Sequence, residues 1–359
     1  MSISLRMQNQ LASAVVIKGD TMSSTLTIYN QKIKPGEAKV IMIPMPQLYD
    51  STPLMMPVHV IRGKKSGPIL SLTAAIHGDE INGIEIIRRI LKKKLLNRLS
   101  GTIIAIPIVN MYGFLYQDRY LIDRRDLNRF FPGSQRGSLA SRLAYIISHE
   151  IIDKCTHCID LHTGSLHRSN LPQIRTNLDN PKTKKLAKSF NAPITLHAKL
   201  RDGSLRSYAS QKNIPFLLYE SGEALRFDEF SIKVGVKGIL NVMRTLKMIK
   251  STADVAVSSS PLSFARSSYW VRAQHSGIIQ AKQQLGALVQ KGTLLAKIGD
   301  PMYTTEYKVT APIGGIIIGK NNLPMIHEGA AIFHIASFKN IDLVSEKIEG
   351  IQEFFDESM

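Results

Sequence analysis

Two histidines and one glutamate lie where the sequence predicts that buried strands end. His77 and Glu80 directly follow the apolar run 68–76, and His162 follows a similar run at 157–161. In α/β sheets, ligand chemistry usually lies at the carboxyl ends of the strands. Two imidazoles and one carboxylate suit zinc and leave a coordination position open for water. The pattern therefore predicts a catalytic metal site with these three side chains as ligands.

A short loop between the two histidines is unusually rich in arginine. Residues 119–133 contain four arginines and one asparagine: Arg119, Arg124, Arg125, Asn128 and Arg129. Arginine is the side chain best shaped to hold a carboxylate through two parallel hydrogen bonds. An exposed basic loop is the structural alternative, but the density of arginine favours anion binding.

A further carboxylate, Glu220, follows the apolar segment 215–219, which has the pattern of another strand. A glutamate in this position can accept a proton from a metal-bound water. Asp160, two residues before His162, is a candidate hydrogen-bond partner for a metal ligand. These two carboxylates extend the predicted site beyond its three ligands.

Each predicted metal ligand also has a structural interpretation. His77 and His162 fit polar strand-end residues, and Glu80 fits a helix-start carboxylate favoured by the helix dipole. Their joint arrangement favours the metal site. The remaining histidines lack such company and are interpreted as structural or surface groups: His59, His149, His157, His167, His197, His275, His327 and His334.

The composition is that of a soluble globular protein. The chain has 359 residues, enough for a full core and more consistent with two domains than with one. No uninterrupted apolar stretch approaches the ~20 residues of a membrane helix. The first ten residues lack the features of a secretory signal, which predicts a cytoplasmic location. Cys155 and Cys158 allow no disulfide framework, and without a second pair they are interpreted as buried structural residues.

The net charge of +18 raises the question of nucleic-acid binding. The basic residues are scattered along the chain, and no recognised nucleic-acid-binding motif accompanies them. We therefore interpret them as a solvated basic surface that helps to attract anionic substrates.

Residues 1–250 have the pattern of one α/β domain. Apolar segments within 37–62 predict antiparallel strands that lead into the sheet. Strands then alternate with helices, which predicts a mixed, largely parallel sheet flanked by helices. The predicted strands are 68–76, 102–108, 157–161 and 215–219, and the predicted helices are 80–94, 138–153, 182–190 and 228–249.

The composition changes after residue 250. Residues 251–267 are interrupted by a Ser-Ser-Ser-Pro sequence and predict a linker. Residues 268–337 contain short apolar segments separated by glycines, which predict a small all-β domain. Residues 338–359 form a tail that fits either a helix or a loose terminus.

Four motifs occur in order between residues 77 and 222: His-Gly-Asp-Glu (77–80), Asp-Leu-Asn-Arg-Phe-Phe-Pro-Gly (126–133), Asp-Leu-His-Thr-Gly (160–164) and Tyr-Glu-Ser-Gly (219–222). In these motifs the chain resembles the succinylglutamate desuccinylase and aspartoacylase family, relatives of the zinc carboxypeptidases. Each motif alone is weak, but the four in order are specific.

The resemblance implies a role for each matching residue. One zinc ion per subunit would be bound by His77, Glu80 and His162, with Glu220 as general base and then acid. Asn128 and Arg129 would hold the carboxylate of the substrate. An upstream arginine would polarise the scissile carbonyl, and Arg119 is our choice, with Arg124 and Arg125 as alternatives.

Residues 268–336 resemble the barrel-sandwich hammerhead of biotinyl and lipoyl carrier domains. Such carriers have a lysine at the tip of a hairpin, whereas the corresponding turn, 300–306, contains none. We therefore expect an appended β domain that shapes or covers the entrance of the active site.

The residues and the resemblance together predict a zinc-dependent deacylase that cleaves the amide bond of a small N-acyl amino acid or related N-acylated amine. One alternative is a metallocarboxypeptidase acting on peptide C-termini, with the same metal set. The alternative of another class is a non-catalytic binding protein with a basic surface. No nucleic-acid or membrane partner is expected. The acyl group, the amine and the oligomeric state stay open, with a homo-oligomer as one alternative.

Overall fold

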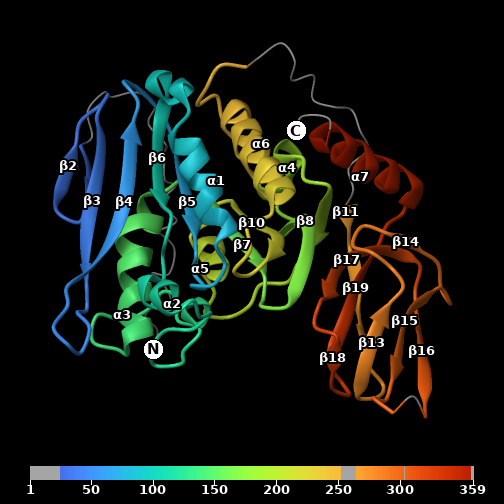
Figure 1. Cartoon of the computed structure of the whole chain (residues 1–359). Helices are drawn as coiled ribbons and strands as arrows, with labels where there is room; N and C mark the ends of the chain where they lie inside the picture. Colours follow the sequence, from blue (N-terminus) through green and yellow to red (C-terminus); the bar gives the residue numbers. More distant parts are fainter. Residues whose placement is uncertain (1–24, 252–263, 303, 357–359) are drawn as a thin grey trace, which may run out of the picture.

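A mixed β-sheet with helices on both faces forms the larger part of the molecule, and a smaller β unit follows it in the chain (Figure 1). The computed structural model describes residues 25–251, 264–302 and 304–356. The predicted fold class, an α/β sheet flanked by helices with a small C-terminal β unit, is confirmed.

Four neighbouring parallel strands form the centre of the sheet. They are β5 (Lys65–Ala74), β6 (Ser100–Ile106), β7 (His157–Gly164) and β10 (Phe216–Glu223). Most of their residues are buried, which explains why they form near-continuous apolar runs in the sequence. Because parallel strands point the same way, their carboxyl ends meet at one edge of the sheet.

The N-terminal side of the sheet is antiparallel. β3 (Ala38–Met45) pairs with β4 (Leu54–Arg62), as the apolar segments predicted, and β4 pairs with β6. A short hairpin of β1 (Leu26–Ile28) and β2 (Gln31–Ile33) packs Ile28 and Ile33 into the adjoining core.

On the other side, β8 (Arg168–Thr176) runs antiparallel to β10, and β9 (Ile194–His197) runs parallel to β8. The sequence analysis did not predict either strand. β8 carries Arg168, Asn170 and Gln173 among its apolar residues, so it shows neither an apolar run nor a clean alternation.

Helices cover both faces of the sheet. On one face, α1, α4 and α6 contribute Ile87, Phe190 and Ile239 to a buried cluster with the central strands. On the opposite face, α2, α3 and α5 pack into a second cluster. The α-helices are α1 (Asn82–Leu91), α2 (Met111–Tyr116), α3 (Leu139–Ile146), α4 (Pro181–Phe190), α5 (Leu205–Gln211) and α6 (Glu229–Thr245), with a π-helical turn at Ile147–Ile151 and 3₁₀ turns at Lys94–Arg98, Leu127–Arg129 and Ile152–Lys154.

The C-terminal β unit is joined to the main sheet by backbone hydrogen bonds. β17 (Gly315–Asn321) pairs antiparallel with β8, and β19 and β12 continue the sheet beyond it. A separate four-stranded sheet in the order β16-β15-β13-β18 packs against these strands around a small apolar core. The remaining strands are β11 (Phe264–Ala265), β12 (Ser267–Arg272), β13 (Gly277–Ala281), β14 (Leu288–Val289), β15 (Leu294–Gly299), β16 (Glu306–Thr310), β18 (Met325–Ile326) and β19 (Ala331–Ser337).

Most of the predicted linker falls on residues 252–263, which lie outside the described residues. The first ten residues, for which no secretory signal was predicted, also lie outside them. The rest of the predicted linker includes strand residues, because β11 pairs with β9 and β12 begins at Ser267. The tail contains α7 (Ile341–Asp356), whose Val344 and Ile348 pack on strand residues of the main sheet and the β unit.

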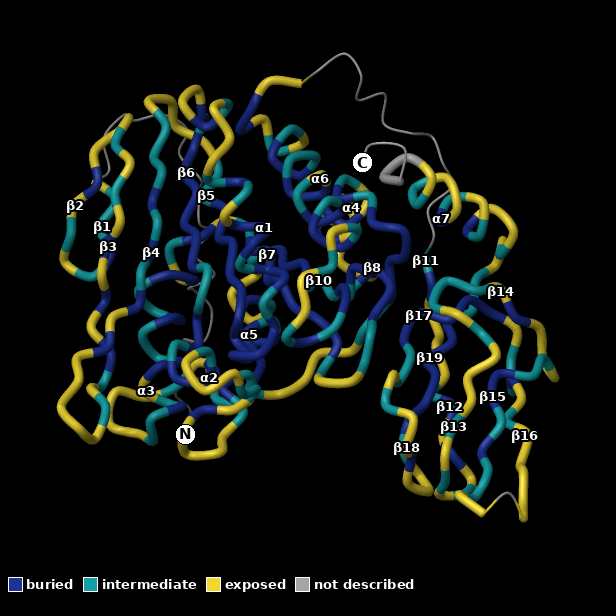
Figure 2. The backbone as a smooth tube through the Cα atoms, in the orientation of Figure 1, coloured by how far each residue is buried: buried dark blue, intermediate teal, exposed yellow. Residues whose placement is uncertain are grey.

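Burial is concentrated in the central strands and in the helices that pack on them (Figure 2). Within the described residues, each helix is too short or too polar to cross a lipid bilayer.

We predict that Gly238→Ala destabilises the fold. Gly238 lies on α6 against α4, and an added Cβ would stand 2.2 Å from the ring of Phe190. Such overpacking lowers the free energy of unfolding by about 1–3 kcal/mol. Gly350→Ala on α7 is the matched control, because nothing lies within 4 Å of its added Cβ. Urea unfolding followed by circular dichroism measures both, and equal or higher stability of the Gly238 variant would contradict this packing.

Candidate metal centre and active site

The predicted metal ligands come together at the edge where the central strands end. His77 and Glu80 lie in the loop between β5 and α1, and His162 lies near the end of β7. All three are buried, with 2–4% of their surface exposed. The loop passes close to α2, where a Cβ on Gly78 would stand 2.0 Å from the carbonyl carbon of Gly113. Glycine in the His-Gly-Asp-Glu motif is therefore required by space.

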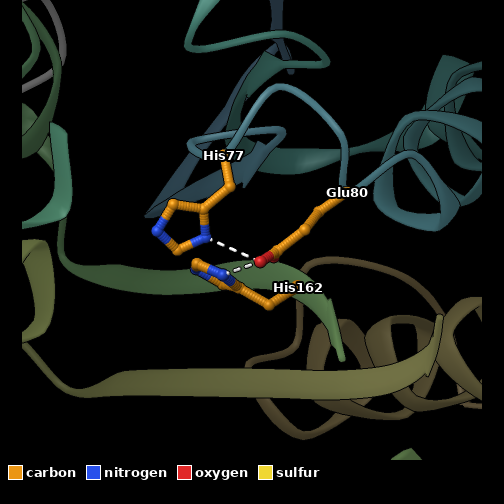
Figure 3. Close-up of side chains that lie close together, drawn as sticks. All are labelled: His77, Glu80 and His162. Carbon is orange, nitrogen blue, oxygen red and sulfur yellow. Dashed lines mark hydrogen bonds and ion pairs between the residues drawn. The ribbon is translucent and has the colours of Figure 1, made fainter. Parts of the chain in front are cut away.

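Glu80 is the centre of the group (Figure 3). Its Oε1 is 2.7 Å from Nδ1 of His77, and its Oε2 is 2.8 Å from Nδ1 of His162. The two imidazole rings are 5.1 Å apart between centroids and nearly perpendicular, at 67°. Two nitrogens and one carboxylate thus face a common point.

A second carboxylate supports each imidazole from behind. His77 Nε2 is 3.1 Å from Oδ1 of Asp126, and His162 Nε2 is 2.8 Å from Oδ2 of Asp160. When Nε2–H donates to a carboxylate, the lone pair of Nδ1 is left for the centre, which is the usual arrangement of metal-binding histidines. Thr73 in turn donates to Oδ1 of Asp160 at 2.5 Å.

The charges of the cluster compensate one another. Burial alone would raise the pKa of Glu80, but His77 and His162 hold that pKa below its ordinary value. Burial likewise opposes protonation of His162, yet Asp160 and Glu80 raise its pKa well above the ordinary value. Both directions follow from opposite charges held in contact inside the protein.

The donor set fits a metal ion. One ligand atom from each of His77, Glu80 and His162 can be chosen so that all lie within 4.8 Å of one another. The three side chains are buried, and two have the orienting carboxylates that metal-binding histidines require. A set of two nitrogens and one oxygen suits zinc. Catalytic zinc sites keep a further coordination position open for water or substrate.

The two histidines also line a cavity of about 400 Å³. This volume is suited to a small molecule. The other lining residues are Arg119, Asn128, Arg129, Asp160, Arg175, Ala198, Lys199, Leu200, Arg201, Ser204, Arg206, Leu218 and Glu220. The residues of the predicted site therefore line this cavity, except the buried Glu80 and the two alternative arginines, Arg124 and Arg125.

Glu220 approaches the cavity from β10. Its Oε2 accepts a hydrogen bond from Nδ2 of Asn170 at 2.6 Å, and its Oε1 lies 3.8 Å from Nη1 of Arg175. The side chain is 16% exposed. Oε1, which has no hydrogen bond among the described residues, is the atom that remains available for proton transfer.

Arg119 is the arginine of the predicted three that lines the cavity. Its Nη1 is 3.1 Å from Oε1 of Glu80, and its Nη2 is 3.3 Å from Oδ2 of Asp126. Arg125 instead donates to Asp123 on an exposed turn, and Arg124 is itself exposed, with a φ of 63°. The geometry thus favours Arg119 over the two alternatives.

Asn128 and Arg129 lie on the wall next to Arg119. The Oδ1 atom of Asn128 accepts the backbone N–H of Leu205 at the start of α5, at 2.9 Å. This hydrogen bond to Oδ1 fixes the orientation of the Asn128 amide, and Nδ2 remains as a donor. Nη2 of Arg129 lies 3.7 Å from Oδ2 of Asp126.

Several functional side chains were missed by the sequence analysis. Asp126 has one usable signal, since it is an aspartate at the N-cap of the turn Leu127–Arg129. The cavity cations Arg175, Lys199, Arg201 and Arg206 have none, because nothing in the sequence separates them from the rest of the 46 lysines and arginines.

Arg206 has unused hydrogen-bonding capacity. Nη2 donates to the carbonyl of Lys199 at 2.6 Å, whereas Nη1 is buried without a hydrogen-bond partner. Burial lowers the pKa of Arg206 to about 10, and Glu220 opposes this shift. The guanidinium therefore stays charged at neutral pH, with one buried donor unsatisfied.

Residues 66–246 match the family profile described as the succinylglutamate desuccinylase/aspartoacylase catalytic domain, over half of the chain. The chain belongs to this family. The resemblance drawn from the four motifs is thereby confirmed. The matched residues contain the metal set, the cavity residues and Glu220.

Individual relatives are distant. An N-alpha-acetyl-L-2,4-diaminobutyric acid deacetylase from Halomonas elongata is 24% identical over 258 residues, covering 69% of this chain and 75% of that protein. A crystal structure of succinylglutamate desuccinylase/aspartoacylase from Rhodobacter sphaeroides has a TM-score of 0.75 at 23% identity, covering 85% of this chain and 95% of that chain. The product-bound ectoine utilization protein EutE (DoeB) from Ruegeria pomeroyi has a TM-score of 0.75 at 22% identity, covering 84% and 95%. The shared fold thus extends beyond residues 66–246.

We predict that Asp160→Asn weakens metal binding by about 10- to 100-fold, because the carboxylate that orients His162 is lost. Asp126→Asn has the same effect through His77. Titration of metal-stripped protein with Zn²⁺ against a chelating dye measures the affinity. Asp123→Asn is the control, since Asp123 contacts Arg125 on the surface. Unchanged affinity in both site variants would show that the two aspartates do not support the metal ligands.

Proposed function

We propose that the protein is a zinc-dependent deacylase that hydrolyses the amide bond of a small N-acyl amino acid or related N-acylated amine. The observation that carries the proposal is the cavity of about 400 Å³, which joins the buried histidines, Glu220 and the basic wall in one space. Membership of the desuccinylase/aspartoacylase family supports the same reaction class.

One zinc ion per subunit would be held by His77, Glu80 and His162. When bound, the ion supplies the Lewis acidity that makes water a competent nucleophile at neutral pH. The remaining steps belong to side chains of this chain.

Glu220 is proposed to move the proton. Asn170 occupies Oε2, so Oε1 takes the proton of the attacking water and delivers it to the leaving amine. The products are a carboxylate and a free amine. The burial of most of the Glu220 side chain keeps this transfer away from bulk solvent.

Arg119 and its neighbours are proposed to hold the substrate. The guanidinium of Arg119 can stabilise the negative charge that develops on the carbonyl oxygen. Nδ2 of Asn128 and the guanidinium of Arg129 would grip the carboxylate of the amino-acid part. All three residues line the cavity.

Further cations at the cavity support a second anionic group on the substrate. Lys199, Arg201 and Arg206 all line it, and Nη1 of Arg206 is a buried donor without a hydrogen-bond partner among the described residues. The deacetylase from Halomonas elongata is named for an N-acetylated diamino acid. For the present protein, the excess of cations favours N-acyl amino acids with an additional carboxylate. The small volume favours such molecules over the peptide substrates of a carboxypeptidase.

We predict that zinc-loaded protein releases primary amine from at least one member of a panel of N-acetyl, N-succinyl and N-formyl amino acids. Glu220→Gln lowers kcat by about 10²- to 10⁴-fold, because the proton acceptor is removed. Its zinc content stays equal to that of the wild type. A wild-type protein that binds zinc but hydrolyses no member of the panel would favour the non-catalytic binding protein.

We predict that Arg206→Met raises KM by about 10- to 100-fold for substrates with a second carboxylate, since a charge-assisted hydrogen bond is worth about 1.5–3 kcal/mol. Substrates without that carboxylate are affected little. Arg124→Met, on the exposed turn, is the matched control. Equal KM changes for both substrate types would contradict the proposed anion contact.

A further inference from the structure

Asn170 lies between the main sheet and the C-terminal β unit. It is 7% exposed and sits on β8, where it is in register with Gly222 of β10 on one side and Gly319 of β17 on the other. Its Nδ2 donates to Oε2 of Glu220 at 2.6 Å. One side chain thus connects the C-terminal unit with the carboxylate at the cavity.

The backbone around Glu220 does not fix its carboxylate. The pairings of β10 with β7 and with β8 both lose regular register after Glu220. The side chain has three rotatable bonds, and Arg175 lies at 3.8 Å, beyond hydrogen-bond distance. Among the described residues, Nδ2 of Asn170 is the hydrogen-bond donor to the Glu220 carboxylate, and Arg175 adds a longer ion pair at the other oxygen.

The β unit in turn restricts Asn170. A Cβ added to Gly319 would stand 3.1 Å from Oδ1 of Asn170 and 3.2 Å from Cβ of His334. His334 is 2% exposed and stacks on Trp270 at 4.1 Å between ring centroids, with 11° between the planes. Asn170 therefore rests against a packed layer of β17, β19 and β12, which leaves its amide little space to rotate away.

A second contact joins the same elements nearer to solvent. Nδ2 of Asn322, just after β17, contacts Oγ of Ser169 at 2.6 Å and Oε2 of Glu223 at 2.8 Å. Its backbone N–H also donates to the carbonyl of His167 at 2.7 Å. The end of β17 is thus tied both to the start of β8 and to the end of β10, which lie at the same end of this antiparallel pair, next to the contact between Asn170 and Glu220.

We propose that Asn170 is a positioning residue for Glu220, and that the C-terminal β unit, through Gly319, holds Asn170 in place. The inference rests on the proposed function, in which Glu220 transfers the proton. The β unit then serves catalysis by fixing the orientation of the general base from behind, on the side away from the substrate. A donor on Oε2 leaves Oε1 directed to the reacting atoms.

The test compares Asn170→Asp and Asn170→Ala with the wild type on a substrate identified in the panel. Both variants lose the donor, and the Asp variant keeps the size of the side chain. We expect kcat to fall by about 10- to 100-fold with KM changed less than twofold and zinc content unchanged, as for a hydrogen bond made to a charged group. In a Glu220→Gln background, the same substitutions should cause no further loss, because interacting residues are not additive.

Gly319→Ala tests the role of the β unit. Its added Cβ pushes on Asn170, so we expect kcat to fall about three- to tenfold, with no further fall when Asn170→Ala is already present. Gly314→Ala is the matched control in the same unit, since its added Cβ meets only atoms at 3.6 Å or more. Equal kcat for the wild type and both glycine variants would remove the β unit from the proposal.

The outcomes separate this inference from the proposed function. If the wild type is active but the Asn170 variants keep its kcat, or lose activity additively with Glu220→Gln, only the positioning role fails. If the wild type hydrolyses no substrate, the proposed function fails. A crystal structure of the zinc-loaded protein tests the contact independently of activity: Asn170 and Glu220 within hydrogen-bond distance support the inference, and their separation overturns it.

Discussion

The site is organised by the burial of one carboxylate. Glu80 is 2% exposed, and a charge in such a position is strongly unfavourable unless neighbouring groups compensate it. His77 and His162 approach its two oxygens, and Arg119 approaches one of them from the cavity. Asp126 and Asp160 then hold the far nitrogens of the imidazoles. A cation held by His77, Glu80 and His162 would add to this compensation.

The sheet makes that convergence possible, because its central strands run parallel and end together. β5 and β7 deliver the metal set, β10 delivers Glu220, and the loop from Arg119 to Arg129 closes one wall. β8 has a different role. It runs antiparallel between β10 and β17 and thereby makes the C-terminal strands a continuation of the catalytic sheet. Strands of the β unit consequently lie next to β8, whose Asn170 donates to Glu220.

The predictable parts of the fold and site are those with a local signal. The central strands were predicted to within a few residues, because burial on both faces requires continuous apolar runs. The helix predicted at 80–94 is present but shorter, because α1 begins at Asn82. Glu80 lies in the loop before it, where its carboxylate contacts His77 and His162. β8 was missed because Asn170 and Gln173 are polar side chains whose partners, Glu220 and the carbonyl of Ile318, are distant in the sequence.

By itself, the sequence determined the chemical types of the metal set and placed them at strand ends, because strand periodicity and ligand chemistry are properties of short segments. It also identified the arginine-rich loop. Only the tertiary structure decided that Arg119 rather than Arg124 or Arg125 lines the cavity, that Arg206 lines it too, and that Asn170 donates to Glu220. These side-chain placements depend on strand pairing and on the space left between segments that are distant in the sequence. They are stabilised by packing and burial rather than by local conformational preference.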